Sequence, residues 1–124
     1  MDAAMQANLA ALKAQPKFVD EPGTIYNGMR PEEMRQLTQA RLNDLIERLM
    51  YGPGDLPAKR FALSQFAKSP TQFPGYDTED RERMCRHLER IMEIVGIEHS
   101  GGLLARWLYG PILGTFVWLR YRTN

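Results

Sequence analysis

Proline and glycine residues divide this chain into short segments, and that division limits the length of any regular element. The breaks fall at Pro16, Pro22-Gly23, Asn27-Gly28, Gly52-Pro53-Gly54, Ser69-Pro70, Phe73-Pro74-Gly75, Gly96 and Gly110-Pro111. Proline cannot continue a helix, and glycine favours turns and helix ends, so each break is expected to end an element. The chain therefore has room for several helices of at most about twenty residues each.

Between the breaks, apolar residues recur every three or four positions, as on one face of a helix. Residues 31–51 carry Met34, Leu37, Leu42, Leu45, Ile46 and Leu49, residues 56–68 carry Phe61, Leu63, Phe66 and Ala67, and residues 77–95 carry Met84, Leu88, Ile91 and Val95. Helices are predicted near residues 3–15, 31–51, 56–68, 77–95, 101–109 and 111–122. Residues 111–122 also have the composition of a strand, but no second clear strand could pair with them, so a helix is favoured.

The predicted fold class is all-α: a compact bundle of five to six helices, with residues 1–124 forming a single domain. Residues 16–30 are expected to form an irregular loop, because they hold three turn-forming positions. The apolar residues of this loop are expected to pack on the body of the domain. They are Phe18, Val19, Ile25 and Tyr26.

Charge and composition exclude several classes of protein. The 16 basic and 15 acidic residues nearly cancel, which argues against a general nucleic-acid binder. The single cysteine, Cys85, cannot form an internal disulfide, and the first residues lack the features of a signal peptide, so a cytoplasmic protein is expected. Residues 101–119 are largely apolar, but Arg106 leaves only 13 uncharged residues before Arg120, and we expect no membrane insertion.

No catalytic, cofactor or metal motif is visible. Cys85 and His87 are two positions apart on a predicted helix and would point to opposite sides, so they cannot act as nucleophile and base. The two histidines are too far apart in sequence for a helical metal site. The segment Ser100-Gly101-Gly102 could bind an anion, but it lacks the length and the lysine of a phosphate loop and is interpreted as a helix cap. The protein is therefore predicted not to be an enzyme.

Two further patterns have alternative interpretations. Residues 77–98 hold seven acidic and four basic side chains, which could form a docking face for a basic partner or could be offset by basic segments of the same chain. The hexapeptide at residues 48–53 recurs in similar form at 106–111. A duplicated helical unit would explain this repeat, but two helix ends built in the same way explain it better.

The chain resembles a small family of uncharacterised bacterial proteins, a domain of unknown function, over residues 77–110. The resemblance is carried by residues 77–83 (DTEDRER), 91–98 (IMEIVGIE), 100–104 (SGGLL) and 107–110 (WLYG). It implies a helical domain of about this size and a bacterial or phage-borne source. It implies no catalytic residues.

Small size and the lack of catalytic motifs favour a protein that acts by binding another protein. The leading hypothesis is an immunity or antitoxin-like protein that neutralises a toxic bacterial effector enzyme. The alternative is a homo-oligomeric helical module, such as a homodimer, or a small-ligand sensor. Aromatic and arginine residues are common anchors of interfaces. The candidate partner-binding residues are Tyr26, Phe73, Tyr76, Glu79, Glu82, Arg106 and Trp107.

Overall fold

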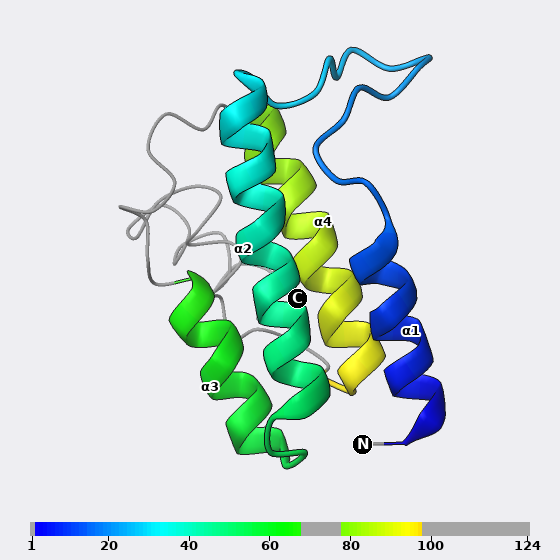
Figure 1. Ribbon diagram of the computed structural model, residues 1–124, viewed down its shortest axis with the longest axis vertical. Coiled ribbons are helices and arrows are strands. Elements are labelled where there is room, and N and C mark those ends of the chain that lie inside the picture. Colours follow the sequence, from blue (N-terminus) through cyan, green and yellow to red (C-terminus); the bar gives the residue numbers. More distant parts are fainter. Residues whose placement is uncertain (1, 68–77, 98–124) are drawn as a thin grey trace, which may run out of the picture. The chain divides into compact units, whose positions relative to one another are not determined.

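The computed structural model describes residues 2–67 and 78–97, and within these ranges the chain forms four helices and no strand (Figure 1). The helices are α1 (Ala3–Ala14), α2 (Glu32–Tyr51), α3 (Leu56–Ala67) and α4 (Thr78–Val95). The chain divides into two compact units, Met1–Ala62 and Leu63–Asn124, each of which is described by itself. The all-helical character expected from the sequence is thus found in the described residues.

The first four predicted helices are present, and each begins and ends within one residue of its expected position. This agreement arises because helix ends depend on local chemistry that can be read from the sequence, such as the capping side chain of Asp2 and the glycine at position 96. The two remaining predicted helices, near residues 101–109 and 111–122, lie outside the described residues. The choice between helix and strand for residues 111–122 therefore stays a prediction, as does the single-domain organisation.

Helix α1 begins at a side-chain cap and packs against α2. The carboxylate of Asp2 accepts a hydrogen bond from the backbone N–H of Met5 at 2.8 Å, which satisfies one of the free donors of the first turn. In the N-terminal unit, α1 and α2 run antiparallel (Figure 1). The side-chain amide of Gln6 donates to the carbonyl of Met50 at 2.7 Å, and Lys13 forms an ion pair with Glu47. These contacts lie along the length of α1 and fix its register on α2.

Helix α2 has one buried face, which is made of Thr38, Leu42, Leu45, Ile46 and Leu49. Four of the predicted core residues are in this set. The prediction that Leu37 belongs to the core is wrong, because its side chain is 46% exposed. Thr38 takes the core position instead, and its hydroxyl donates to the carbonyl of Met34 at 2.7 Å, which removes the cost of burying a polar group. Leu37 lies about 100° around the helix from Thr38 and so points away from the core.

Helix α3 differs from the expected pattern at Phe61, which is 65% exposed, whereas Leu63 is buried. Helix α4 follows the expected pattern, with Met84, Leu88, Ile91 and Val95 all buried. Its end is also as expected. Gly96 has a φ of 83°, and the N–H of Ile97 donates to the carbonyl of Met92 at 2.8 Å, which is the hydrogen bond of a left-handed glycine cap.

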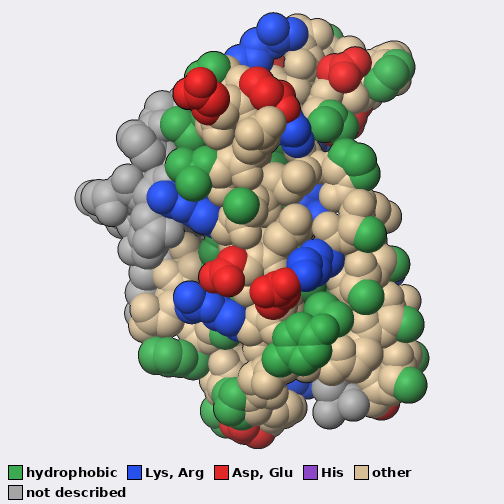
Figure 2. Space-filling view, viewed as in Figure 1, with side chains coloured by type: hydrophobic (Ala, Val, Ile, Leu, Met, Phe, Trp, Pro, Cys, Tyr) green, Lys and Arg blue, Asp and Glu red, His purple; other side chains and the backbone are tan. Residues whose placement is uncertain are grey.

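The charged side chains on the face seen in Figure 2 are interspersed rather than separated by sign. Within the described helices, some charged side chains form short-range pairs, such as Arg48 with Asp44 at 3.3 Å in α2 and Arg90 with Glu93 at 3.1 Å in α4. Such exposed pairs each contribute little to stability. In the described stretches no helix combines the length and the apolar character needed to cross a membrane.

Candidate functional site

The segment between α1 and α2 folds back on itself as a loop over residues 18–29, here called the 18–29 loop. The backbone N–H of Met29 donates to the carbonyl of Phe18 at 2.8 Å, and the N–H of Glu21 donates to the carbonyl of Tyr26 at 3.1 Å. The side chains of Phe18, Tyr26 and Met29 are each at most 3% exposed. The loop is therefore anchored by two backbone hydrogen bonds and three buried side chains, as the sequence suggested for Phe18 and Tyr26.

The same prediction is wrong for the other two apolar residues of the loop. Ile25 is 80% exposed and Val19 is 37% exposed. Ile25 lies in the exposed stretch 22–25, which the hydrogen bond between Glu21 and Tyr26 closes into a turn. Composition alone does not distinguish an apolar residue at the tip of a loop from one at its base.

Two positive φ angles hold the base of the 18–29 loop in shape. Gly28 has a φ of 85°, and a Cβ atom on it would lie 3.0 Å from the backbone nitrogen of Asp20 and 3.1 Å from the carbonyl oxygen of Phe18. Phe18 itself has a φ of 60°, a conformation that residues other than glycine seldom adopt. The Asn-Gly pair at 27–28, taken from the sequence as a turn, is thus also a close approach between two backbone segments.

A cleft of about 320 Å³ opens between this loop and the first turn of α2. It is lined by Phe18, Val19, Asp20, Asn27, Gly28, Met29, Arg30, Glu32 and Arg35. The lining combines an apolar wall with two carboxylates and two guanidinium groups. A cleft of this volume is large enough to hold a small molecule. The sequence analysis did not identify it, because its residues are contributed by a turn and by a helix terminus.

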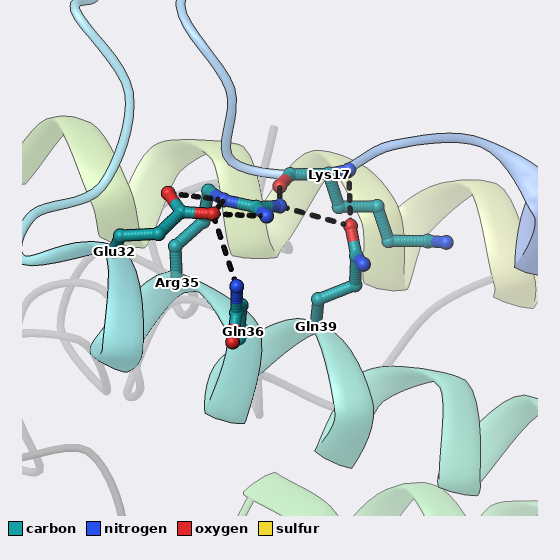
Figure 3. A network of polar contacts seen from close by, with 5 residues as sticks. All are labelled: Lys17, Glu32, Arg35, Gln36 and Gln39. Atoms are coloured by element: carbon teal, nitrogen blue, oxygen red, sulfur yellow. Dashed lines mark hydrogen bonds and ion pairs between the residues drawn. The ribbon is translucent and has the colours of Figure 1, made fainter.

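The charged pair at the floor of the cleft is saturated with hydrogen bonds (Figure 3). The Nε of Arg35 donates to both carboxylate oxygens of Glu32, at 2.9 and 2.8 Å, and its Nη1 donates to the carbonyl of Lys17 at 3.3 Å and to Oε1 of Gln39 at 3.4 Å. Gln36 also donates to Glu32. The hydrogen bond from Arg35 lowers the pKa of Glu32 and, in return, raises the pKa of Arg35. Both groups therefore stay ionised and fixed in place.

Lys17, next to this pair, is a buried lysine with an exposed fraction of only 1%. Its ammonium group donates to the carbonyls of Lys13 and Gln15, at 3.0 and 2.9 Å, and to Oδ1 of Asn43 at 2.8 Å. Its backbone N–H donates to Oε1 of Gln39 at 2.7 Å. Burial lowers the pKa of Lys17 to about 8. The ammonium group of Lys17 thus satisfies backbone carbonyls at the end of α1, and the bonds of Lys17 to Asn43 and Gln39 link that end to α2.

The structure separates the predicted partner-binding residues. Tyr26 was expected to be an exposed anchor, but it is only 2% exposed, so that expectation is wrong. A ring that is this deeply buried cannot present a face to a partner. Glu79 is half-buried and Glu82 is exposed, both in the first turns of α4. Phe73, Tyr76, Arg106 and Trp107 lie outside the described residues. The large apolar side chains that are exposed, and that the sequence analysis missed, are Ile25, Tyr51 and Phe61, at 80%, 79% and 65%.

Cys85 has the environment of a core residue. Its side chain is 7% exposed, and burial, with smaller contributions from the charges of Glu89 and Glu82, raises the pKa of its thiol to about 12. A nucleophilic cysteine needs a lowered pKa, so the shift at Cys85 has the wrong direction for catalysis. Among the residues that the structure describes, no group of three or more His, Cys, Asp and Glu side chains is placed to hold a metal ion.

Fold and site together define a small helical domain with a polar cleft beside its first interhelical loop. Its sequence from residue 1 to 111 matches the model of a domain of unknown function, DUF4844, and the chain belongs to that family. The family resemblance noted for residues 77–110 is thereby confirmed and extends over most of the chain. No curated protein matches the chain significantly.

One similar solved structure is the crystal structure of a DUF3571 family protein from Acinetobacter baumannii AYE. It is 25% identical in sequence and superimposes with a TM-score of 0.74, covering 91% of this chain and 94% of that chain. The two proteins therefore share a fold over nearly their whole lengths.

Proposed function

We propose that this chain is a protein-binding domain with no chemistry of its own, and that it acts as an immunity or antitoxin-like protein that neutralises a toxic bacterial effector enzyme. The observation that carries the proposal is the exposure of large apolar side chains in the N-terminal unit. Tyr51 and Phe61 are 79% and 65% exposed, although Leu49 in the helix of Tyr51 and Leu63 in the helix of Phe61 are buried.

These two aromatic residues have the chemistry of interface anchors. Tyr51 is the last residue of α2 and Phe61 lies within α3, so both are held on helices rather than on a mobile segment. An exposed arginine is close to each in sequence, Arg48 one turn before Tyr51 and Arg60 directly before Phe61. Tyrosine and arginine are enriched among the residues that dominate binding energy, because they bury a large area and also form directional polar contacts.

The environment of Cys85 supports a role in binding rather than catalysis. The thiol is the most reactive nucleophile that a chain of this composition offers, and it is buried with its pKa raised to about 12. Blocking an enzyme requires no reactive group. It requires a surface that covers the active site of the target and excludes its substrate.

The proposal is tested by purifying the tagged full-length chain from its native host and identifying what co-elutes at equal stoichiometry. The expected result is one enzyme whose activity is inhibited by the pure protein. The double variant Tyr51→Ser, Phe61→Ser is expected to weaken that inhibition at least tenfold, because each lost hot-spot residue costs more than about 1 kcal/mol. Ala40→Ser, at an exposed position of the same helix, serves as the control and should inhibit normally.

Two results would contradict the proposal. The chain could co-elute only with itself, and its mass by light scattering would then show whether it forms a homo-oligomer. Alternatively, the co-eluting enzyme could retain full activity in the presence of excess protein. In either case neutralisation is ruled out as the role of this domain.

A further inference from the structure

Of the four charged side chains that line the cleft, two are paired with each other within the protein and two have no such pairing. Glu32 and Arg35 pair with each other, as described above. The remaining two charges are the carboxylate of Asp20 and the guanidinium of Arg30, and both side chains are exposed. Neither forms an ion pair or a side-chain hydrogen bond in the described part of the chain. One negative and one positive charge are thus left facing the same small cleft.

The backbone fixes the places of these two groups. Asp20 is two residues beyond Phe18, and Arg30 directly follows Met29, whose N–H binds the carbonyl of Phe18 at 2.8 Å. The two sides of the 18–29 loop lie close together here, since a Cβ atom on Gly28 would be 3.0 Å from the backbone nitrogen of Asp20. Because the loop is already ordered by these contacts, binding a ligand in the cleft would require little further loss of conformational freedom.

Beside these charges, the lining includes the polar Asn27 and three apolar side chains. Phe18 and Met29 are each 3% exposed and form a fixed wall, and Val19, which is 37% exposed, extends this wall toward solvent. A volume of about 320 Å³ lies at the low end of the range for small-molecule sites. A ligand that suits the cleft is therefore small, carries one charge of each sign, and has a compact apolar part.

We propose that the cleft binds a free neutral α-amino acid, with its carboxylate on Arg30, its ammonium group on Asp20, and its apolar side chain against Val19 and Met29. A simple anion would be repelled by Asp20, and a simple cation would be repelled by Arg30. An uncharged molecule would offer neither group an opposite charge. A zwitterion offers an opposite charge to both groups at once, and this proposal is independent of any protein partner.

The test compares a ligand with two truncated forms of it on the full-length chain. The probes are L-phenylalanine, phenylpropionate, which lacks the ammonium group, and phenethylamine, which lacks the carboxylate. Affinities are measured by calorimetry, and the site is located by amide chemical shifts. Phenylalanine is expected to bind about ten times more tightly than either truncated probe, which is about 1.4 kcal/mol for each lost charged contact. The perturbed amides should be those of residues 18–30.

Variants of Asp20 and Arg30 give sharper evidence. Each should abolish the preference for phenylalanine over one truncated probe and keep the preference over the other. In Asp20→Asn, phenylalanine should lose its advantage over phenylpropionate but keep its advantage over phenethylamine. In Arg30→Gln the reverse is expected. Both side chains are exposed, so neither change should affect folding. Glu33→Gln is the matched control, an exposed carboxylate in the same helix turn as Glu32 that does not line the cleft.

Three results would overturn the proposal. The first is that neither phenylalanine nor the smaller leucine and methionine binds at a concentration of about 10 mM, which corresponds to less than about 3 kcal/mol of binding energy. The second is that the three phenyl probes bind equally well. The third is that binding is unchanged in both Asp20→Asn and Arg30→Gln.

Discussion

The buried lysine at the end of α1 makes a prediction about the pH dependence of stability. Lys17 has a pKa of about 8 in the folded protein, against a usual value of 10.5. Between these two values the unfolded chain binds a proton that the folded chain has released. The free energy of unfolding therefore rises with pH across this interval, and the cost of burying the charge is present in full only below pH 8.

The size of the effect follows from the shift. Each pKa unit corresponds to about 1.4 kcal/mol, so Lys17 should add about 3 kcal/mol to the free energy of unfolding between about pH 6.5 and pH 10.5. The variant Lys17→Met keeps the length of the side chain and removes the titrating group. At neutral pH the sign of its effect is open, because it removes a buried charge but also leaves the carbonyls of Lys13 and Gln15 without a donor.

The quantity to measure is consequently the difference in unfolding free energy between the wild type and Lys17→Met as a function of pH, obtained by urea denaturation followed by circular dichroism. Other titrating groups are common to both proteins and cancel in the difference. Lys13→Met is the control. The hydrogen bond with Glu47 raises the pKa of Lys13, so the stability that Lys13 contributes is present below its usual pKa and is lost as pH rises above it. Between pH 7 and pH 10.5 the difference for Lys13→Met should therefore stay nearly constant, whereas the difference for Lys17→Met should change by about 3 kcal/mol.

Parallel stability curves for the wild type and Lys17→Met between pH 7 and pH 10.5 would refute this reasoning. They would mean that the ammonium of Lys17 reaches water in the folded state, and hence that the end of α1 does not pack on α2 as described.

Three further predictions concern the fold. Gly28→Ala should lower the free energy of unfolding by about 2–3 kcal/mol, because the residue has a positive φ and a Cβ atom would contact backbone. Gly23 has a similar φ but open space around it, so Gly23→Ala should lower the free energy of unfolding by only about 1 kcal/mol. Thermal denaturation of both variants checks this prediction. Leu42→Ala, at a fully buried position, should cost about 2–5 kcal/mol, and Leu37→Ala less than about 1 kcal/mol, by urea denaturation. Cys85 should react with a thiol reagent at neutral pH only after denaturation; rapid reaction in the folded protein would contradict its burial.

The helices could be predicted from the sequence because their boundaries depend on local chemistry. Asp2 caps α1, and Gly96 ends α4, and both residues act on atoms within a few positions of themselves. The apolar stripe of α4 was also clear, since half of the intervening positions are charged. The stripe of α2 was less well determined, because a threonine that bonds to its own helix can replace a leucine in the core, as Thr38 does for Leu37.

The cleft could not be predicted, for a physical reason. Its shape depends on the pairing of two backbone segments and on the positive φ angles of Phe18 and Gly28, and none of the side chains that line it has an unusual spacing in the sequence. The burial of Lys17 was equally hidden, because lysine is normally exposed and only three-dimensional proximity to Asn43 provides its third acceptor. The expectation that Tyr26 is an exposed anchor was wrong for a related reason, because a position near a turn does not imply that a side chain is exposed.

The tip of the 18–29 loop has a consequence for how members of this family can differ in length. Residues 22–25 are exposed, and a Cβ atom on Gly23 would meet nothing within 4 Å. The two pairing hydrogen bonds and the buried side chains of the loop all lie on either side of this stretch. Extra residues inserted there would lengthen the chain without disturbing the docking of α1 on α2. We expect insertions and deletions among relatives to gather at this tip, while the spacing from Lys17 to Asp20 and from Tyr26 to Arg35 stays constant.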